Sequence, residues 1–319
     1  MALIPPFAPA EGAPPRALWP FARWALRGAW PGIWLATAIS ALGGVTEVLA
    51  ALALGWVVDA AVAHDGGDFW ARNGGLVAGF VLFFLVLRPL AFGLNSAANF
   101  LLIAPNVDPL VLSRLNRWTM GQDIGFFDND FAGRIAQKQI QTARALTDVV
   151  SETINTAAFA LASLVGSVAM VALIDWRLGA ALVGWSALYL GLIRVFLPHI
   201  RARSAARAGA RAMVTGQVVD TITNIRTVKL FAHARHEDQG ALGAMARFRA
   251  QVMAFGRVSA LFRSFLMLLA GLLPVLLVGG SLWLWSVGRA SPGEIVAAGT
   301  IAIRLAQMTG WVSFTLMAI

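Results

Sequence analysis

Residues 153–198 read TINTAAFALASLVGSVAMVALI, then DWR, then LGAALVGWSALYLGLIRVFLP. Two apolar stretches of more than 18 residues are separated here only by Asp175, Trp176 and Arg177. An apolar stretch of that length can cross the hydrocarbon core of a bilayer as a helix. This part of the chain therefore predicts two membrane-spanning helices with a very short connection between them.

The composition of the whole chain is also that of a membrane protein. Of its 319 residues, 58% are apolar and 13% are charged, and the mean hydropathy is +0.71. Soluble domains carry about 25% charged residues. The absence of cysteine excludes disulfides, thiol catalysis and cysteine-based zinc sites. The histidines show no ligand constellation, so we expect no metal site; they are His64, His199, His233 and His236.

Four further apolar stretches bring the number of predicted spans to six. The approximate limits of all six are residues 30–61, 73–104, 153–174, 178–198, 257–287 and 294–319. The connections alternate between short and long, which places every long loop on the same side of the membrane. Residues 1–29 are rich in proline and alanine and are predicted to be a flexible cytoplasmic tail. The six-span domain is then residues 30–319, and we expect the chain to stop within its sixth span.

The basic residues indicate which side of the membrane the long loops occupy. Of 25 lysines and arginines, three lie in the tail, five in residues 105–152 and ten in residues 201–257. Cytoplasmic loops carry an excess of such residues, so both long loops and the N-terminus are predicted to be cytoplasmic. Topology thus accounts for the net charge of +9 without a nucleic-acid partner. The tail and the second long loop should instead attract anionic lipid headgroups.

Both long loops have helical periodicity and few helix breakers. Residues 200–256 contain no proline, so the fourth span is predicted to continue into the cytoplasm as one helix and the fifth to rise from there. A helix over residues 178–219 would be about 60 Å long, twice the hydrocarbon thickness. The sequence therefore predicts an all-α polytopic membrane protein with six transmembrane helices and long cytoplasmic helical extensions.

Two strings in these loops resemble the transmembrane domain of ABC exporters. They are FFDNDFAGRI at residues 126–135 and NIRTVKLFA at residues 224–232, and the DWRL turn at residues 175–178 is similar to that family as well. The resemblance covers residues 18–319. It implies the type I exporter fold, the permease region of such a transporter.

The resemblance implies partners and a mode of coupling. A second transmembrane half would pair with this one, and nucleotide-binding domains that bind ATP and magnesium would follow the sixth span. Coupling segments would be residues 118–128 and 221–228, and the contact residues Phe126, Phe127, Asp128, Asn224 and Arg226. Two bulky aromatic side chains at a polar loop tip need a surface against which to bury. The alternative is that Phe126 and Phe127 pack within their own loop bundle.

The chain itself lacks a phosphate-binding P-loop. That motif requires a lysine after a glycine, whereas Lys138 and Lys229 follow Gln137 and Val228. ATP hydrolysis by that route is therefore excluded for this chain, and no cofactor is expected in it. We expect the ATPase either in the remainder of a longer polypeptide or in a separate subunit.

Polar residues at helical spacing within the spans form candidate cavity-lining stripes. The candidates are Glu47, Arg88, Asn95, Arg304, Gln307 and Trp311. Arg304 is predicted to lie near the bilayer midplane, where an unpaired charge costs at least about 2.5 kcal/mol. One interpretation is that these residues meet an amphipathic substrate. The other is that Glu47 forms a fixed structural pair with Arg304 or Arg88.

The resulting functional prediction is the permease half of an ATP-driven exporter in the bacterial inner membrane. It would move a lipid, drug or peptide by alternating access. The alternatives are a secondary transporter and a membrane scaffold without transport. A secondary transporter would need internal repeats and broken helices; the halves show no clear similarity, although Pro89, Pro274 and Gly279-Gly280 interrupt the second and fifth predicted spans. The sequence does not choose the substrate, nor a homodimer over a heterodimer.

Overall fold

The computed structural model describes residues 3–63, 69–128, 131–230 and 234–318, with the side chains of 234–237 and 314–318 left out. Within these ranges every regular element is a helix, which confirms the predicted all-α class. Six of the helices are long and apolar enough to cross a membrane, as the sequence predicted. The described residues form two compact units, one of residues 3–180 with 274–317 and the other of residues 181–273.

The predicted flexible tail is instead folded against the rest of the first unit. Helix α1 (Leu18–Ala25) precedes the first span, α2 (Trp30–Ala63). Ile4 is 1% exposed and belongs to the same apolar core as Val107 and Leu110. The prediction of flexibility was wrong because a proline- and alanine-rich composition does not reveal an anchor that lies about a hundred residues further along the chain.

That anchor is Arg114, which is 3% exposed. Its guanidinium donates hydrogen bonds to the main-chain carbonyls of Ala8, Trp24, Ala25 and Arg27 at 2.7–3.1 Å. Trp24 and Ala25 are the last residues of α1, so the positive charge lies at the negative end of that helix. Burial lowers the pKa of Arg114, and the charges of Arg117 and Arg27 lower it further.

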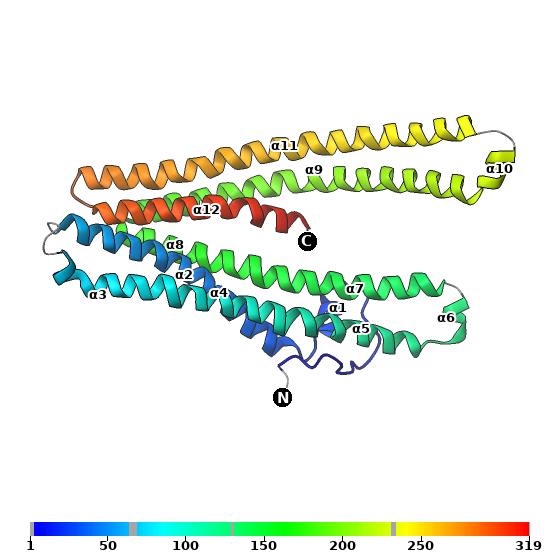
Figure 1. Ribbon diagram of the computed structural model, residues 1–319, viewed down its shortest axis with the longest axis horizontal. Coiled ribbons are helices and arrows are strands. Elements are labelled where there is room, and N and C mark those ends of the chain that lie inside the picture. The colour runs from blue at the N-terminus through cyan, green and yellow to red at the C-terminus, as the bar shows by residue number, and fades with distance from the viewer. Residues whose placement is uncertain (1–2, 64–68, 129–130, 231–233, 319) are drawn as a thin grey trace. The chain divides into compact units, whose positions relative to one another are not determined.

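The second span runs without interruption into the first extension (Figure 1). Its helical segments are α3 (Phe69–Leu82), η1 (Phe83–Leu87), α4 (Arg88–Ala97), η2 (Ala98–Ile103) and α5 (Ala104–Met120). The π-helical segments η1 and η2 precede Pro89 and Pro105, which cannot donate a main-chain hydrogen bond. Asn106 Nδ2 donates to Leu101 O at 3.3 Å, the carbonyl that Pro105 leaves without its helical partner. The helix therefore continues through both Pro89 and Pro105, with a π-helical segment before each.

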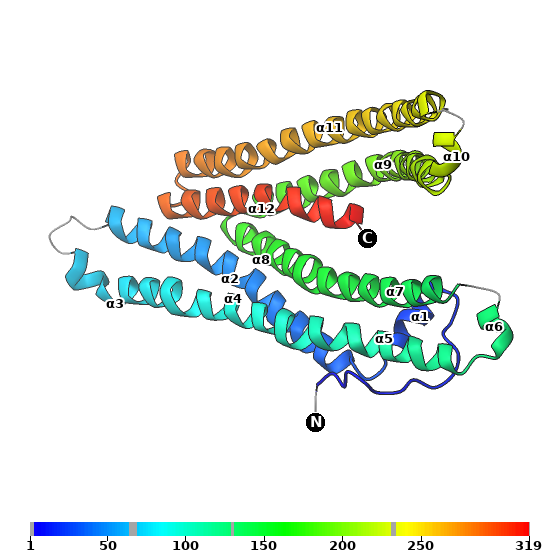
Figure 2. The same ribbon diagram turned by 45° about the vertical axis from the view of Figure 1, so that its right-hand side comes forward.

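The first extension returns through a short helix at its tip. After α5 come α6 (Ile124–Asp128) and α7 (Ala132–Glu152), and α7 continues through η3 (Thr153–Ala158) into the third span, α8 (Phe159–Ile174). Residues 129 and 130 of the first family-like string lie outside the described residues. In Figures 1 and 2, α5 and α7 lie side by side with α6 across their ends.

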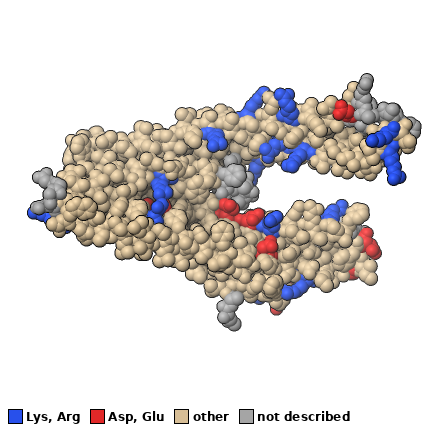
Figure 3. All heavy atoms as spheres, in the orientation of Figure 1, with Lys and Arg blue, Asp and Glu red and all other residues tan. Residues whose placement is uncertain are grey.

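The second extension repeats this design on a larger scale. Helix α9 (Trp176–Thr223) has 48 residues, α10 (Ile225–Leu230) lies at the tip, and α11 (Ala234–Ser286) has 53 residues. The predicted continuation of the fourth and fifth spans into long helices is thus confirmed. Pro198 and Pro274 lie inside these helices without ending them. In Figure 3, Lys and Arg side chains are visible at several places along the second extension.

Small residues allow the spans of the first unit to approach closely. A Cβ added at Gly44 of α2 would lie 2.5 Å from the main-chain oxygen of Phe159, at the start of α8. Ser40 of α2 donates to Ile154 O at 2.7 Å. Close helix contact through glycine and serine is the usual packing mode in a bilayer, where apolar burial alone gives little association.

The sixth span, α12 (Pro292–Ala318), is fixed to α2 near its first turn. Asp59 accepts hydrogen bonds from Gly293 N and Ser291 Oγ, both at 2.7 Å. Ser291 and Glu294 also form a reciprocal capping box, in which each side chain bonds the other residue's main-chain N–H. The start of α12 therefore has a defined position relative to α2.

Candidate functional site

The first unit holds an ionic cluster of Glu47, Arg88 and Arg304, which come from α2, α4 and α12. Glu47 is 6% exposed, and its Oε1 accepts from Arg88 Nη2 at 2.8 Å and from Nε at 3.3 Å. Its Oε2 lies 3.0 Å from Arg304 Nη1, an ion pair without hydrogen-bond geometry. The sequence left open which arginine would pair with Glu47, and the structure pairs it with both. One carboxylate between two guanidinium groups leaves the cluster with a formal charge of +1.

Aromatic rings enclose the Arg88 side of the cluster. The guanidinium carbon of Arg88 lies 5.9 Å from the ring centre of Phe84 and 5.4 Å from that of Phe92. Such cation–π contacts stabilise a cation that has left water. Phe92 in turn contacts Phe159, and Phe159 contacts Trp311, with ring centres 6.1 and 6.2 Å apart. Sequence analysis missed the phenylalanines, although Phe84 and Phe92 stand at i−4 and i+4 from Arg88.

The predicted stripe on α12 lies on one face of that helix. Arg304, Gln307 and Trp311 are exposed, whereas Leu305 and Met308 on the other face are buried. The Arg304 side chain is 44% exposed, against 26% for Arg88. Arg304 is therefore the accessible member of the ionic cluster, and Gln307 and Trp311 follow it one and two turns further along the helix.

Asn95 lies on the same face of α4 as Arg88, two turns away. It is half-buried, and its side-chain oxygen accepts no hydrogen bond from the described residues. The side-chain oxygen of Asn99, one turn further, likewise accepts no hydrogen bond from the described residues. A buried amide oxygen without a donor costs free energy, so this stripe provides acceptors for water or a ligand.

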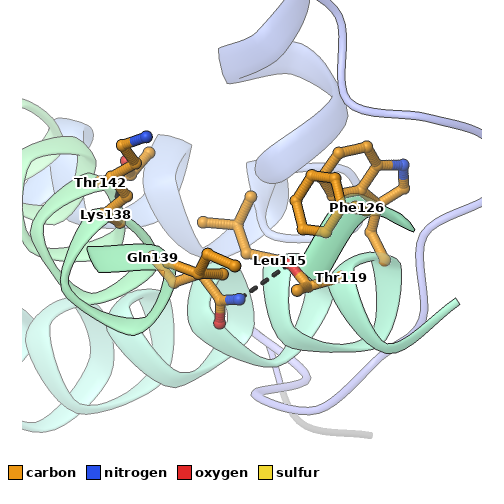
Figure 4. Close-up of a pocket in the computed structure, with 8 residues that line it drawn as sticks. Leu115, Thr119, Phe126, Lys138, Gln139 and Thr142 are labelled. Carbon is orange, nitrogen blue, oxygen red and sulfur yellow. Dashed lines mark hydrogen bonds between the residues drawn. The ribbon is translucent and has the colours of Figure 1, made fainter. Parts of the chain in front are cut away.

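At the tip of the first extension, the two predicted aromatic contact residues, Phe126 and Phe127, have different surroundings. Phe126 turns inward against Trp118, with ring centres 6.1 Å apart at 83°. It lines a pocket of about 430 Å³ together with Leu115, Thr119, Ile135, Lys138, Gln139 and Thr142 (Figure 4). Gln139 bridges α7 to α5 by donating to Thr119 Oγ1 at 2.8 Å. Phe126 thus has the packing expected of the alternative interpretation, burial within its own loop bundle.

Phe127 packs edge-to-face against Phe126, with ring centres 5.3 Å apart, but is itself 41% exposed. Three further apolar side chains around it are 73–80% exposed: Met120, Ile124 and Phe131. Asp128, the last residue of α6, is exposed as well. We call Met120, Ile124, Phe127 and Phe131 the first tip surface. Sequence analysis had selected only Phe127 from this set.

The tip of the second extension has a similar composition. Asn224 joins α9 to α10, and its Nδ2 donates to Asp220 O and Oδ1 at 3.1 and 3.0 Å. Asn224 therefore fixes the turn. Arg226 is exposed, and apolar side chains flank it: Ile222, Ile225 and Leu230 are 64%, 40% and 81% exposed. We call these four residues the second tip surface.

No group of three His, Asp or Glu residues that could hold a metal ion occurs in the described part of the chain. His64 and His233 lie outside the described residues, as does the side chain of His236.

Comparison with known sequences explains this arrangement. Residues 33–308 match the family described as the ABC transporter transmembrane region. The chain belongs to this family. It is also 28% identical over 271 residues to an "Uncharacterized ABC transporter ATP-binding protein" of Haemophilus influenzae. The match covers 84% of the chain and 44% of that relative, so the chain spans less than half the relative's length. Family membership makes the chain a membrane component of an ABC transporter and an integral multi-pass membrane protein.

Proposed function

We propose that the chain is the permease half of an ATP-driven exporter that moves an amphipathic substrate by alternating access. The observation that carries the proposal is the pair of short exposed helices, α6 and α10, at the ends of extensions that are continuous with the spans. A displacement of α6 or α10 would be carried along helices of 43 to 53 residues into the membrane. Such helices are suited to act as levers.

The motor would be a nucleotide-binding domain outside this chain. The relative from Haemophilus influenzae is named for ATP binding, and more than half of its length lies outside the match. ATP and magnesium would therefore bind outside this chain, either in a domain that follows the sixth span or in a separate subunit. A second transmembrane half would complete the transporter, as a homodimer or a heterodimer.

The two tip surfaces would be the docking sites for these domains. Their apolar side chains are exposed at helical ends that also carry charged residues. Exposed apolar patches with polar surroundings mark protein interaction sites. Phe127 and Arg226 within these surfaces, together with Asp128 beside the first, would make the contacts. Phe126 and Asn224 would hold α6 and α10 in place.

The positive-inside distribution of Lys and Arg supports a cytoplasmic position for both extensions and for the N-terminal segment. The proposed membrane is the bacterial inner membrane, which separates ATP from the exterior. The lipid headgroups of its inner leaflet would contact the basic residues of the second extension.

The decisive experiment is transport by the complete gene product, with its nucleotide-binding domain, in lipid vesicles. Uptake of amphipathic dyes into inside-out vesicles should require ATP and should persist when proton and sodium gradients are dissipated. Uptake that follows an ion gradient and ignores ATP would instead identify a secondary transporter. Absence of uptake and of ATP turnover would identify a scaffold.

A further inference from the structure

We infer that the ionic cluster of Glu47, Arg88 and Arg304 recognises an anionic group on the transported molecule, a phosphate, sulfonate or carboxylate attached to an apolar body. This inference names the substrate class and rests on the proposed export function. It starts from the imbalance of charge, because two guanidinium groups share one carboxylate.

No other acid of α2 compensates the cluster. Asp59 lies twelve residues further along that helix, about 18 Å away at 1.5 Å per residue. Both of its oxygens are occupied by the start of α12, at 2.7 Å each. A charge of +1 in an apolar environment is costly unless an anion or water accompanies it.

The two arginines are not equivalent. Arg88 uses Nε and Nη2 on Glu47 and lies between two phenylalanine rings. Arg304 lies with Nη1 3.0 Å from Glu47 Oε2 without hydrogen-bond geometry, and its side chain is 44% exposed. A guanidinium carries five N–H donors in a planar fork, so Nε and Nη2 of Arg304 can bind a second oxyanion while Nη1 stays on Glu47. Glu47 holds Arg304 in position, and the ligand anion neutralises the remaining charge.

The surroundings of Arg304 fit an amphipathic ligand. Gln307 and Trp311 continue the exposed face of α12, and Trp311 is 40% exposed beside Phe159. A ligand whose headgroup binds Arg304 would place its apolar body along this aromatic surface, with the Gln307 amide available as a further donor. The planar fork of a guanidinium can bind two oxygens of one anion at once, which phosphate, sulfonate and carboxylate offer and a halide does not.

The test measures binding of matched ten-carbon probes to the complete gene product in phosphatidylcholine vesicles without nucleotide. The probes are radiolabelled decyl phosphate, decyl maltoside and decyltrimethylammonium, and empty vesicles give the background partition. Decyl phosphate should bind with a Kd at least about tenfold below those of the other two, since hydrogen bonds to charged groups contribute about that factor or more. Equal affinity for all three probes, or preference for the cation, would overturn the assignment.

Variants then locate the site. Arg304→Gln should raise the Kd for decyl phosphate about 10- to 100-fold and leave decyl maltoside unchanged, whereas Arg304→Lys should restore part of the affinity. Arg289→Gln, a matched change at an exposed arginine between α11 and α12, should have no effect. Unchanged decyl phosphate affinity in Arg304→Gln would refute the site. The comparison of probes on the unsubstituted protein remains decisive if that variant does not fold.

A further arm identifies the source of the anion. Vesicles that contain phosphatidic acid should compete with decyl phosphate if the ligand is a membrane lipid, and should not if it is a single-chain amphiphile; both results support an anion site. Because binding is measured without ATP, the outcome is independent of the export proposal. ATP-driven uptake of the cationic probe alone would retain export and reject the anion site.

Discussion

Replacement of Arg114 by methionine should release the N-terminal segment from the first extension. Methionine matches much of the length of arginine but cannot donate to the carbonyls of Ala8, Trp24, Ala25 and Arg27, which receive the four hydrogen bonds of 2.7–3.1 Å. All four acceptors belong to the main chain, so no change at the acceptor residues can restore their partners. The last turn of α1 would also lose the cation at its negative end.

The expected cost is about 3–5 kcal/mol of local stability. A hydrogen bond to a charged group contributes about 1.5–3 kcal/mol, and part of the sum is offset because burial of a guanidinium is itself costly. That cost is visible in the lowered pKa of Arg114. The group nevertheless stays protonated at any accessible pH, so the effect should not depend on pH between about 5 and 9. A loss of 3–5 kcal/mol raises the population of the detached segment more than a hundredfold.

Limited proteolysis with trypsin measures this population, because the segment contains Arg16 and Arg23 and the substitution removes no cleavage site from it. The rate of cleavage within residues 16–27 should rise at least about a hundredfold in Arg114→Met when opening is fast relative to cleavage. Arg117→Met is the control, since exposed Arg117 makes a single hydrogen bond, to Phe7 O at 2.8 Å; it should change the rate less than about tenfold. Equal rates in both variants would show that Arg114 does not anchor the segment.

Three further predictions concern the spans and the tips. Gly44→Ala should lower the melting temperature in detergent through a loss of about 1–3 kcal/mol, because its Cβ would meet a main-chain oxygen of α8, while Gly79→Ala, with open space around it, should not. Glu47→Gln should cost about 3–5 kcal/mol by leaving two arginines without their shared counterion, seen as loss of monodisperse protein in size-exclusion chromatography; a normal elution profile would contradict the paired geometry. Phe127→Ala should reduce substrate-stimulated ATP turnover by the complete protein and leave its melting temperature unchanged. Phe126→Ala should instead lower the melting temperature, because Phe126 packs against Trp118. The reverse pattern would reject the assignment of the first tip surface.

The spans could be predicted from sequence because the property that decides them is local. Twenty or so apolar residues in a row have one stable solution in a bilayer, a helix that bonds its own main chain. The same holds for the extensions, whose helical periodicity continues from the spans without a break. Even the prolines were compatible with continuity, because π-helical segments and the Asn106 side chain absorb the lost hydrogen bonds at Pro105.

Contacts between distant segments could not be predicted in the same way. Arg114 carries no sequence signal that its partners are carbonyls of residues 8–27, since a carbonyl is present at every position. The stripe pattern placed Glu47, Arg88 and Arg304 on the inner faces of their helices, but spacing within one helix does not say which helix is its neighbour. The orientation of Phe126 and Phe127 was open for the same reason, because adjacent residues on a short helix point to different sides.

Helix α12 shows how the pairing and the transport interpretations of Glu47 can both hold. It is attached to α2 twice, by Gly293 on Asp59 and, eleven residues or about 16 Å later, by Arg304 on Glu47. Two attachments fix the direction of the helix as well as its position. Attachment alone uses one guanidinium contact to Glu47, yet two arginines share that carboxylate and the Arg304 side chain is 44% exposed. The excess positive charge is thus free to meet an anion, as we infer, and Gln307 and Trp311, beyond the second attachment, are presented on a helix whose orientation is already set.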